Sequence, residues 1–208
     1  DHRIAQPASR PEPFVEAKDI SSGVLLHGLN ISIGRGEVVG LAGLLGSGRT
    51  EFARILFGAD AMDRGVIHID GKPVSIRVPR QAIGLGFAFC SEDRKAEGII
   101  GDLSVRENII LALQAKRGTF NQLSRAKQEE IADRYIDLLQ IKTASRETPI
   151  KQLSGGNQQK AILARWLATD PNFLILDEPT RGIDIGTKTE IQKLIIQLAG
   201  EGKSIMFI

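Results

Sequence analysis

At residues 43–50 the chain reads Gly43-Leu44-Leu45-Gly46-Ser47-Gly48-Arg49-Thr50. Apolar residues at 37–42 predict a buried strand before this stretch, and residues 50–57 predict a helix after it. Glycines at a strand-to-helix turn let successive N–H groups point at phosphate oxygens near the helix N-terminus. We therefore predict a phosphate-binding loop, with the Thr50 hydroxyl placed to ligate Mg²⁺. The pattern G-x-x-x-x-G-K-[ST] is met except at Arg49, whose planar fork replaces a compact ammonium, so we expect nucleotide binding here but inefficient hydrolysis.

Strands and helices alternate on both sides of this loop. Short apolar stretches predict strands at 14–33, 66–69, 74–76, 87–90, 173–176 and 204–208, and Asp70-Gly71 predicts a hairpin turn. Helices are expected at 107–114, 127–140 and 157–168, and near the end of the chain at Ile191, Leu194, Ile195 and Leu198. In the helix at 127–140, the spacing predicts one buried face made of Ile131, Tyr135, Leu138 and Leu139. This order predicts a mostly parallel sheet with an all-helical insertion.

The overall composition is that of an ordinary globular chain. Its 208 residues carry 27 Lys+Arg against 25 Asp+Glu, a net charge of +2 that is too balanced to indicate nucleic-acid binding. Cys90 is the only cysteine and no Cys/His cluster has metal-ligand spacing, so an internal disulfide and a zinc site are excluded. No apolar run reaches the roughly 18 residues that span a bilayer. Because the chain starts without Met and stops in an apolar run, both ends are expected to be cut.

A second motif follows the predicted strand at 173–176, where Asp177-Glu178 ends a fully apolar run. Such a strand can place carboxylates at the edge of the sheet where the phosphate-binding loop lies. There Asp177 would hold Mg²⁺ through water, and Glu178 would polarise the attacking water. Taken alone, an acidic pair after a strand is as often a solvated strand end as a site. The loop at 43–50 is what favours the functional interpretation.

The third motif is Leu153-Ser154-Gly155-Gly156-Asn157-Gln158-Gln159-Lys160. Ser154 is a candidate N-cap for the helix that follows. Gly155 and Gly156 expose N–H groups where that helix begins, which makes an anion site. A capped helix with no ligand is the simplest alternative. The string L-S-G-G-x-Q, however, resembles the signature motif of ABC-type ATPases, and the order of phosphate loop, signature and Asp-Glu strand is also similar to that family.

The resemblance covers nearly the whole chain from about Phe14 onward. It implies an α/β fold: a P-loop NTPase (RecA-like) core with an antiparallel β subdomain and an inserted α-helical signature subdomain. The implied division is a linker at 1–13, a nucleotide-binding core at 14–94 and 153–208, and a helical subdomain at 95–152. Domains of this family work in pairs, in which the phosphate loop of one domain and the signature of the other sandwich one ATP.

The resemblance also implies a role for individual residues. Glu178 would be catalytic, and Thr50 and Asp177 would hold Mg²⁺. Nucleotide contacts would come from Gly43, Leu44, Leu45, Gly46, Ser47, Gly48, Arg49, Thr50, Glu51, Glu92, Ser154, Gly155, Gly156 and Gln158. The signature residues would touch an ATP held by the partner domain, and Gly182-Ile183-Asp184 falls at the loop that meets that partner. No aromatic residue lies between Phe14 and Phe52, so the usual adenine platform is expected either to be missing or to be replaced by His27 or Phe14.

Departures from the family pattern indicate which subfamily the chain resembles. The segment Cys90-Ser91-Glu92-Asp93-Arg94-Lys95 places Glu92 where the family has a glutamine. Together with Arg49 and the string L-S-G-G-N-Q-Q-K, it looks like the second of two fused domains in bacterial importers of ribose, xylose, arabinose and galactose. The run at 104–114 looks closest to the galactofuranose type. In such a domain the phosphate loop is degenerate, and the signature completes the partner's site.

The activity implied by this resemblance is ATP hydrolysis that powers monosaccharide import. The implied partners are the first ATP-binding domain of the same polypeptide, transmembrane permease subunits and, indirectly, a periplasmic sugar-binding protein, with no nucleic acid. The implied location is the cytoplasmic face of the bacterial inner membrane, where the protein is peripheral.

Three alternatives share parts of this pattern. A non-catalytic regulatory half would mainly complete the partner's ATP site, and Arg49 keeps this alternative open. A DNA-repair or chromosome ATPase normally separates phosphate loop and signature by a long heptad coiled coil, whereas here about a hundred residues intervene without heptads. A translation-associated paired ATPase should carry a basic linker and a more positive charge.

Overall fold

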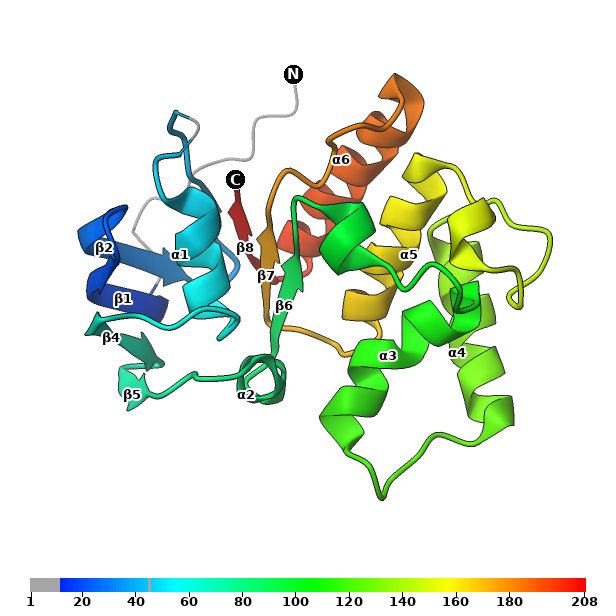
Figure 1. Cartoon of the computed structure of the whole chain (residues 1–208), viewed down its shortest axis with the longest axis horizontal. Coiled ribbons are helices and arrows are strands. Elements are labelled where there is room, and N and C mark those ends of the chain that lie inside the picture. The colour runs from blue at the N-terminus through cyan, green and yellow to red at the C-terminus, as the bar shows by residue number, and fades with distance from the viewer. Residues whose placement is uncertain (1–11, 45) are drawn as a thin grey trace.

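The computed structural model describes residues 12–44 and 46–208, which form two four-stranded sheets (Figure 1). One sheet is antiparallel, in the order β2 (Leu26–Gly34), β1 (Pro13–Ser22), β4 (Arg64–Ile69) and β5 (Lys72–Val74). The other is parallel, in the order β3 (Val38–Gly40), β8 (Ser204–Phe207), β7 (Phe173–Leu176) and β6 (Phe87–Cys90). The expected α/β class, with an antiparallel and a parallel part, is confirmed.

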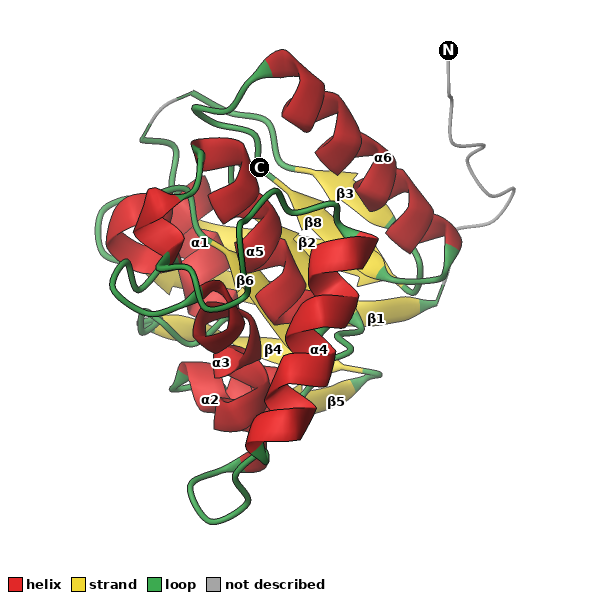
Figure 2. Cartoon of the chain, turned by 90° about the vertical axis from the view of Figure 1, so that its right-hand side faces the viewer, coloured by secondary structure: helices red, strands yellow, loops and turns green. Residues whose placement is uncertain are grey.

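Helices surround the parallel strands. The described residues form α1 (Arg49–Leu56), α2 (Pro79–Gly84), α3 (Val105–Arg117), α4 (Arg125–Leu138), α5 (Gly155–Leu167) and α6 (Ile185–Gly200). Figure 1 shows the antiparallel sheet at one end of the molecule and α3 and α4 at the other, with the parallel strands between them. In Figure 2 the same two helices lie in front of the strands. No helix within the described residues is long and apolar enough to cross a membrane.

Strands β6 and β7 of the parallel sheet are buried along their whole length. Every residue of β6 and β7 is buried, and the rings of Phe87 and Phe173 meet edge to face at 5.0 Å. The strands predicted at 87–90 and 173–176 are therefore confirmed. The buried strand predicted at 37–42 is wrong in extent and burial, since β3 spans three residues and Val38 is 37% exposed. Strand β3 lies at one edge of the sheet and, within the described chain, pairs only with β8, whereas the other edge strand, β6, packs against α2 and α5.

The antiparallel sheet contains the predicted hairpin. Strands β4 and β5 are joined at Asp70 and Gly71, whose φ angles of 49° and 72° are both positive. That combination is the two-residue turn that an Asp-Gly pair favours, because its twist matches that of the strands. The linker predicted at 1–13 falls largely on residues 1–11, outside the described residues, and it is wrong at Pro13, where β1 begins.

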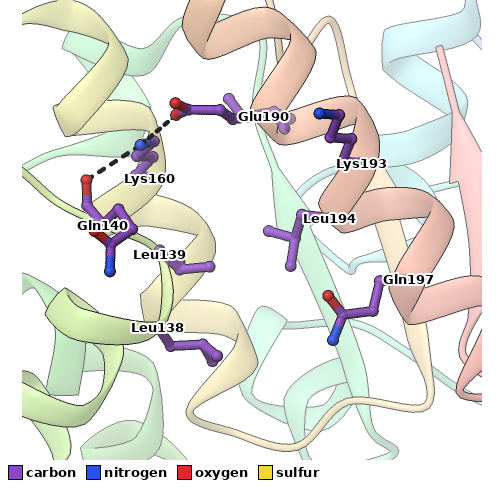
Figure 3. Close-up of a pocket in the computed structure, with 9 residues that line it drawn as sticks. Leu138, Leu139, Gln140, Lys160, Glu190, Lys193, Leu194 and Gln197 are labelled. Atoms are coloured by element: carbon purple, nitrogen blue, oxygen red, sulfur yellow. Dashed lines mark hydrogen bonds and ion pairs between the residues drawn. The ribbon is translucent and has the colours of Figure 1, made fainter.

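Two helices differ in detail from their predictions. The first, α3, starts at Val105 rather than 107, because Ser104 is its N-cap and forms a reciprocal capping box with Glu107. The second, α4, ends at Leu138, which is 56% exposed, so the prediction that Leu138 belongs to a buried face is wrong. Leu138 lies beside a cavity of about 280 Å³ lined by residues of α4, α5 and α6, and no described side chain covers it (Figure 3).

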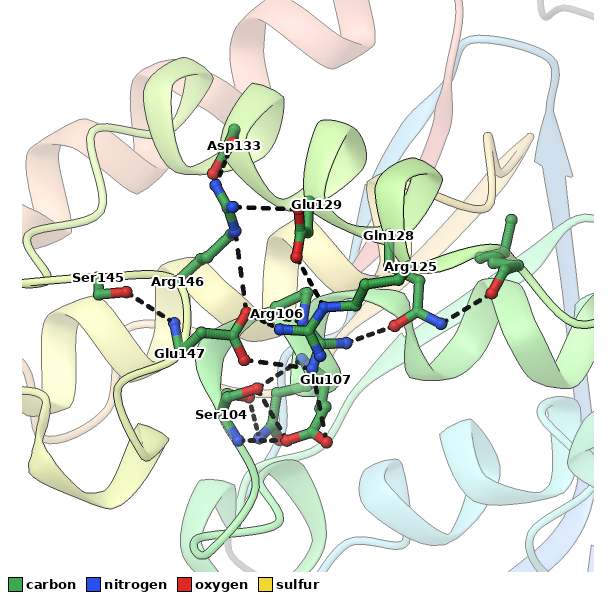
Figure 4. Close-up of polar contacts among 12 residues, drawn as sticks. Ser104, Arg106, Glu107, Arg125, Gln128, Glu129, Asp133, Ser145, Arg146 and Glu147 are labelled. Carbon is green, nitrogen blue, oxygen red and sulfur yellow. Dashed lines mark hydrogen bonds and ion pairs between the residues drawn. The ribbon is translucent and has the colours of Figure 1, made fainter.

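An arginine-rich network joins α3, α4 and the segment that precedes α5 (Figure 4). Arg106 of α3 is buried, and its Nε donates to Glu147 Oε1 at 2.8 Å; its Nη1 donates to Gln128 of α4. Arg146 reaches Asp133 of α4 at 2.7 Å. These contacts hold residues 146 and 147 against the two helices.

Candidate functional site

The loop at 43–50 lies at the carboxyl end of β3 and leads directly into α1. Gly46 and Gly48 have φ angles of 77° and 84°, in the left-handed region that glycine adopts without strain. At Gly48 a Cβ would also lie 2.8 Å from the Leu26 side chain, so the loop has room only for glycine there. Leu45, one of the predicted contact residues, lies outside the described residues.

This loop and the acidic residues predicted from other motifs line one cavity of about 200 Å³. The lining residues are Gly46, Ser47, Gly48, Arg49, Thr50, Glu51, Glu92, Asp177 and Glu178. They come from the β3–α1 turn and from the ends of β6 and β7, because parallel strands deliver their carboxyl ends to the same edge of the sheet. Gly43 and Leu44 do not line the cavity, and the Leu44 side chain is exposed.

Asp177 is the most unusual residue of the cavity. Its N–H donates to the carbonyl of Cys90 at 2.9 Å, while both carboxylate oxygens are buried and accept no hydrogen bond from any described residue. Burial raises the pKa of the Asp177 carboxyl above its usual value, and the neighbouring Thr50 hydroxyl offsets part of this effect. A buried carboxylate without a partner is costly unless a ligand completes it.

The site fits Mg²⁺ on this ground. Mg²⁺ is held in proteins by one or two carboxylates together with phosphate oxygens and water, rather than by a full protein cage. The Asp177 carboxylate and the neighbouring Thr50 hydroxyl, which line the same cavity, supply such a partial set. No group of three or more His, Cys, Asp or Glu residues suited to a metal occurs in the described part of the chain.

Glu178 follows Asp177 with a φ of 42°. A left-handed conformation costs a non-glycine residue about 1–3 kcal/mol, and such residues cluster at functional sites. The conformation is stabilised from outside the turn, since the Glu178 N–H donates to the carbonyl of Ile208 at 3.2 Å. The strained turn aligns the two neighbouring acids so that both line the same cavity.

The third motif lies apart from this cavity. Ser154, Gly155, Gly156 and Gln158 are at the N-terminal end of α5, and none of them lines the cavity. Ser154 is the N-cap residue, as predicted, but its side chain makes no capping bond and instead accepts from Asn157 at 2.9 Å. Gln158 is buried, and its amide nitrogen donates to the carbonyls of Ile150 and Leu153.

The glycines of this motif lie in close contact with other segments, most tightly at Gly156. A Cβ on Gly156 would lie 2.8 Å from the hydroxyl oxygen of Thr187 on α6, and one on Gly155 would lie 2.9 Å from the Arg94 guanidinium. Asp184, in the segment predicted to meet a partner, caps α6 by accepting from the N–H of Thr187 at 2.9 Å. The start of α5 is thus packed against the segments that follow β6 and β7.

Two further observations concern residues weighed from the sequence. Phe14 is buried and the Arg35 guanidinium stacks on its ring at 4.2 Å, so the proposal that Phe14 replaces an adenine platform is wrong. Arg181 was missed, although it contacts both Glu92 and Glu178. Its place three residues after Glu178 was the available signal; Glu92 is too distant in sequence to have indicated it.

Known protein families and curated proteins resemble this chain over most of its length. The family model described as ABC transporter matches residues 26–181. Over 197 residues, the chain is 49% identical to the fructose import ATP-binding protein FruK of Bifidobacterium longum and 53% identical to the galactofuranose transporter ATP-binding protein YtfR of Escherichia coli. These alignments cover 95% of this chain but 38% and 39% of the relatives, so the chain spans about two fifths of their length.

Solved structures agree on the fold. An ATP-binding cassette determined as a dimer in a post-hydrolysis state with ADP and Pi superposes with a TM-score of 0.79 at 25% identity, covering 93% of this chain and 86% of that one. The ADP conformation of another cassette gives a TM-score of 0.76 at 20% identity, covering 94% and 80%.

Proposed function

The chain belongs to the ABC transporter family of ATP-binding proteins, and we propose that it binds and hydrolyses Mg-ATP to power the import of a monosaccharide. The observation that carries the proposal is the single cavity in which the loop glycines, Thr50, Asp177 and Glu178 meet. A monosaccharide as the cargo class is supported by the names of relatives, which are ATP-binding proteins of fructose, ribose and arabinose import and of a galactofuranose transporter.

The proposed roles follow from the chemistry of the residues that line the cavity. Loop N–H groups at 43–50 and the N-terminus of α1 would bind the phosphates, with Arg49 as the side-chain cation. Asp177 and Thr50 would hold Mg²⁺, which when bound neutralises charge on the phosphate oxygens. Glu178 would accept a proton from the attacking water, because its carboxylate lines the cavity directly beside Asp177.

We further propose that this chain is the second ATP-binding domain of a fused pair. Arg49 in the phosphate loop beside an intact L-S-G-G-N-Q motif supports an asymmetric pair, in which this loop turns ATP over slowly. The separation of Ser154, Gly155 and Gly156 from the cavity supports a role at an ATP held by the first domain. The non-catalytic regulatory half remains the alternative, and it is favoured only by Arg49.

The proposed arrangement includes the rest of a transporter. A core at 14–94 and 153–208 with a helical subdomain at 95–152 would dock on permease subunits at the cytoplasmic face of the inner membrane. A periplasmic sugar-binding protein would take part indirectly.

The first test is a calorimetric titration of this chain with Mg-ATP beside Thr50→Ala. We expect saturable binding that Thr50→Ala weakens about ten-fold, because one Mg²⁺ ligand is lost. Thr189→Ala on the exposed side of α6 is the matched control and should bind like the wild type. Absence of binding at millimolar ATP would contradict nucleotide binding and leave the chain as a donor of its signature.

The asymmetric pair is tested in an assembled transporter. Replacing Ser154 by Ala should abolish transport, since it acts at the hydrolysing site, whereas Arg49→Ala should be milder. The reverse ranking in a vesicle transport assay would contradict the proposed division of labour.

A further inference from the structure

Arg181 lies beside the phosphate cavity and contacts two of the acids that line it. Its Nη1 forms an ion pair with Glu92 and lies 3.6 Å from Glu178 Oε2. Glu92 follows β6 and Glu178 follows β7, so the arginine bridges the ends of two neighbouring strands. The bridge starts from a tight turn in which the Arg181 N–H donates to the Glu178 carbonyl at 3.0 Å.

The charge of the cavity makes this bridge significant. Among the described residues that line the cavity, four carry carboxylates, Glu51, Glu92, Asp177 and Glu178, and one, Arg49, carries a positive charge. A triphosphate brought into such a cavity is repelled by each unneutralised carboxylate, and the repulsion is stronger than in bulk water because protein surrounds the site. A second cation on two of these acids removes much of that repulsion.

The main chain of Arg181 is also held from the opposite side. Its carbonyl accepts a hydrogen bond from Arg94 Nη1 at 3.5 Å, and Arg94 Nε donates to Gln158 of α5 at 3.2 Å. A Cβ on Gly155 would lie 3.4 Å from the carbonyl of Gly182, the next residue. The turn that carries Arg181 is therefore packed against the start of α5 and does not stand free.

We propose that Arg181 is a positioning residue of the phosphate site: its guanidinium neutralises Glu92 and orients Glu178, so that an anionic Mg-triphosphate can enter. This inference rests on the proposed function, since it concerns the same nucleotide. Arg49 is the one cationic residue of the loop at 43–50, and the proposal adds Arg181 as a second source of positive charge at the site. An ordinary exposed ion pair would contribute little to stability or binding. The convergence of two site carboxylates on one guanidinium sets Arg181 apart from such pairs.

The test is a set of Mg-ATP titrations in this chain. The proteins are the wild type, Arg181→Ala, Glu92→Gln and the double variant. We expect Arg181→Ala to weaken binding about three- to ten-fold at low salt, because a neutralised carboxylate becomes a repelling one. In the Glu92→Gln background the same substitution should weaken binding less than about two-fold, since the main repelling charge is gone. Raising the salt concentration should shrink the first effect.

Two controls separate positioning from a loss of structure. Arg64→Ala removes a similarly exposed arginine, 66% against 58% for the Arg181 side chain, whose partner Asp19 is not among the residues that line the cavity, and it should leave binding unchanged. Arg181→Lys keeps a positive charge on this turn and should retain more of the affinity than Arg181→Ala.

The outcomes are distinguishable. If the wild type binds but Arg181→Ala binds equally well, or loses the same factor with and without Glu92, the role of Arg181 is refuted and the proposed function stands. If the wild type binds no Mg-ATP, the proposed function is refuted, and this inference with it.

Discussion

Arg94 donates a hydrogen bond from its Nε to the side-chain oxygen of Gln158 across 3.2 Å. Arg94 begins the short turn after β6 and is only two residues from Glu92, whereas Gln158 is buried in the first turn of α5. The amide nitrogen of Gln158 holds the carbonyls of Ile150 and Leu153. The bond thus connects the segment that lines the phosphate cavity to the helix that carries the L-S-G-G-N-Q motif.

Removing this bond should loosen the start of α5. Arg94→Met is expected to lower the free energy of unfolding by about 1.5–3 kcal/mol, the usual contribution of a hydrogen bond to a charged group. It should also speed amide hydrogen exchange at 155–158, which mass spectrometry can follow. Lys95→Met, on the same exposed turn, is the control and should change neither quantity. Unchanged exchange in the Arg94 variant would show that the bond does not order the motif.

The unpartnered carboxylate of Asp177 predicts opposite effects on stability and on binding. Burial raises the pKa of the Asp177 carboxyl, so the folded chain holds this proton more tightly than the unfolded chain does. The stability that the protonated carboxyl provides is fully present below the ordinary pKa of aspartate and is lost as the pH rises through the raised pKa. At neutral pH Asp177→Asn should therefore raise the Tm of the ligand-free chain. A gain of about 1 kcal/mol corresponds to about 2–4 °C at this size. The same variant should lose the rise in Tm that Mg-ATP produces, as thermal unfolding with and without Mg-ATP would reveal.

Cys90 predicts a loss of stability at alkaline pH. Burial raises the pKa of its thiol from 9.0 to about 12, so the folded chain holds a proton that the unfolded chain releases. The stability that this proton provides is fully present below pH 9 and declines as the pH rises towards 12. Between pH 8 and pH 10 the wild type should lose about 1 kcal/mol more than Cys90→Ala in urea unfolding.

Arg165 contributes the opposite slope at higher pH. Burial lowers the pKa of Arg165 to about 10, and its guanidinium donates to the Asn108 and Gly98 carbonyls. The free-energy cost of burying the charged Arg165 guanidinium in the folded chain therefore falls as the pH rises above 10. For this reason the urea unfolding of the wild type and Cys90→Ala is compared only up to pH 10. Equal slopes in the wild type and Cys90→Ala would contradict a protonated thiol.

The arginine network of α3 predicts both a stability loss and a change in acid sensitivity. Arg106→Met should cost about 2–3 kcal/mol, because it leaves Glu147 and Gln128 without their buried donor. Hydrogen bonding to Arg106 holds the pKa of Glu147 below its ordinary value, so the stability it provides is lost as the pH falls through that lowered pKa. The variant should therefore lose less stability on acidification than the wild type.

Arg117→Met serves as the control for Arg106. Arg117 lies near the end of the same helix, and its guanidinium donates only to Asn121 among the described residues. Its loss should change the free energy of unfolding by less than about 0.5 kcal/mol. A similar cost for the two variants would mean that the network adds nothing beyond an exposed contact.

Features that depend on neighbouring residues were correctly predicted from the sequence. The turn at Asp70-Gly71, the strands at 87–90 and 173–176, and the glycine turn before α1 follow from side-chain alternation and from the φ angles that glycine allows. The meeting of Thr50 with Asp177 could also be expected, because both follow strands whose carboxyl ends share one edge.

Features that join distant parts of the chain could not be predicted in this way. The exposure of Leu138 depends on how α4 ends beside α6, and that of Val38 depends on which elements pack against β3. The contacts of Arg181 with Glu92, of Arg94 with Gln158 and of Gly156 with Thr187 connect residues far apart in sequence. Local patterns specify which face of an element is apolar, whereas packing in three dimensions sets which elements those faces and charges meet.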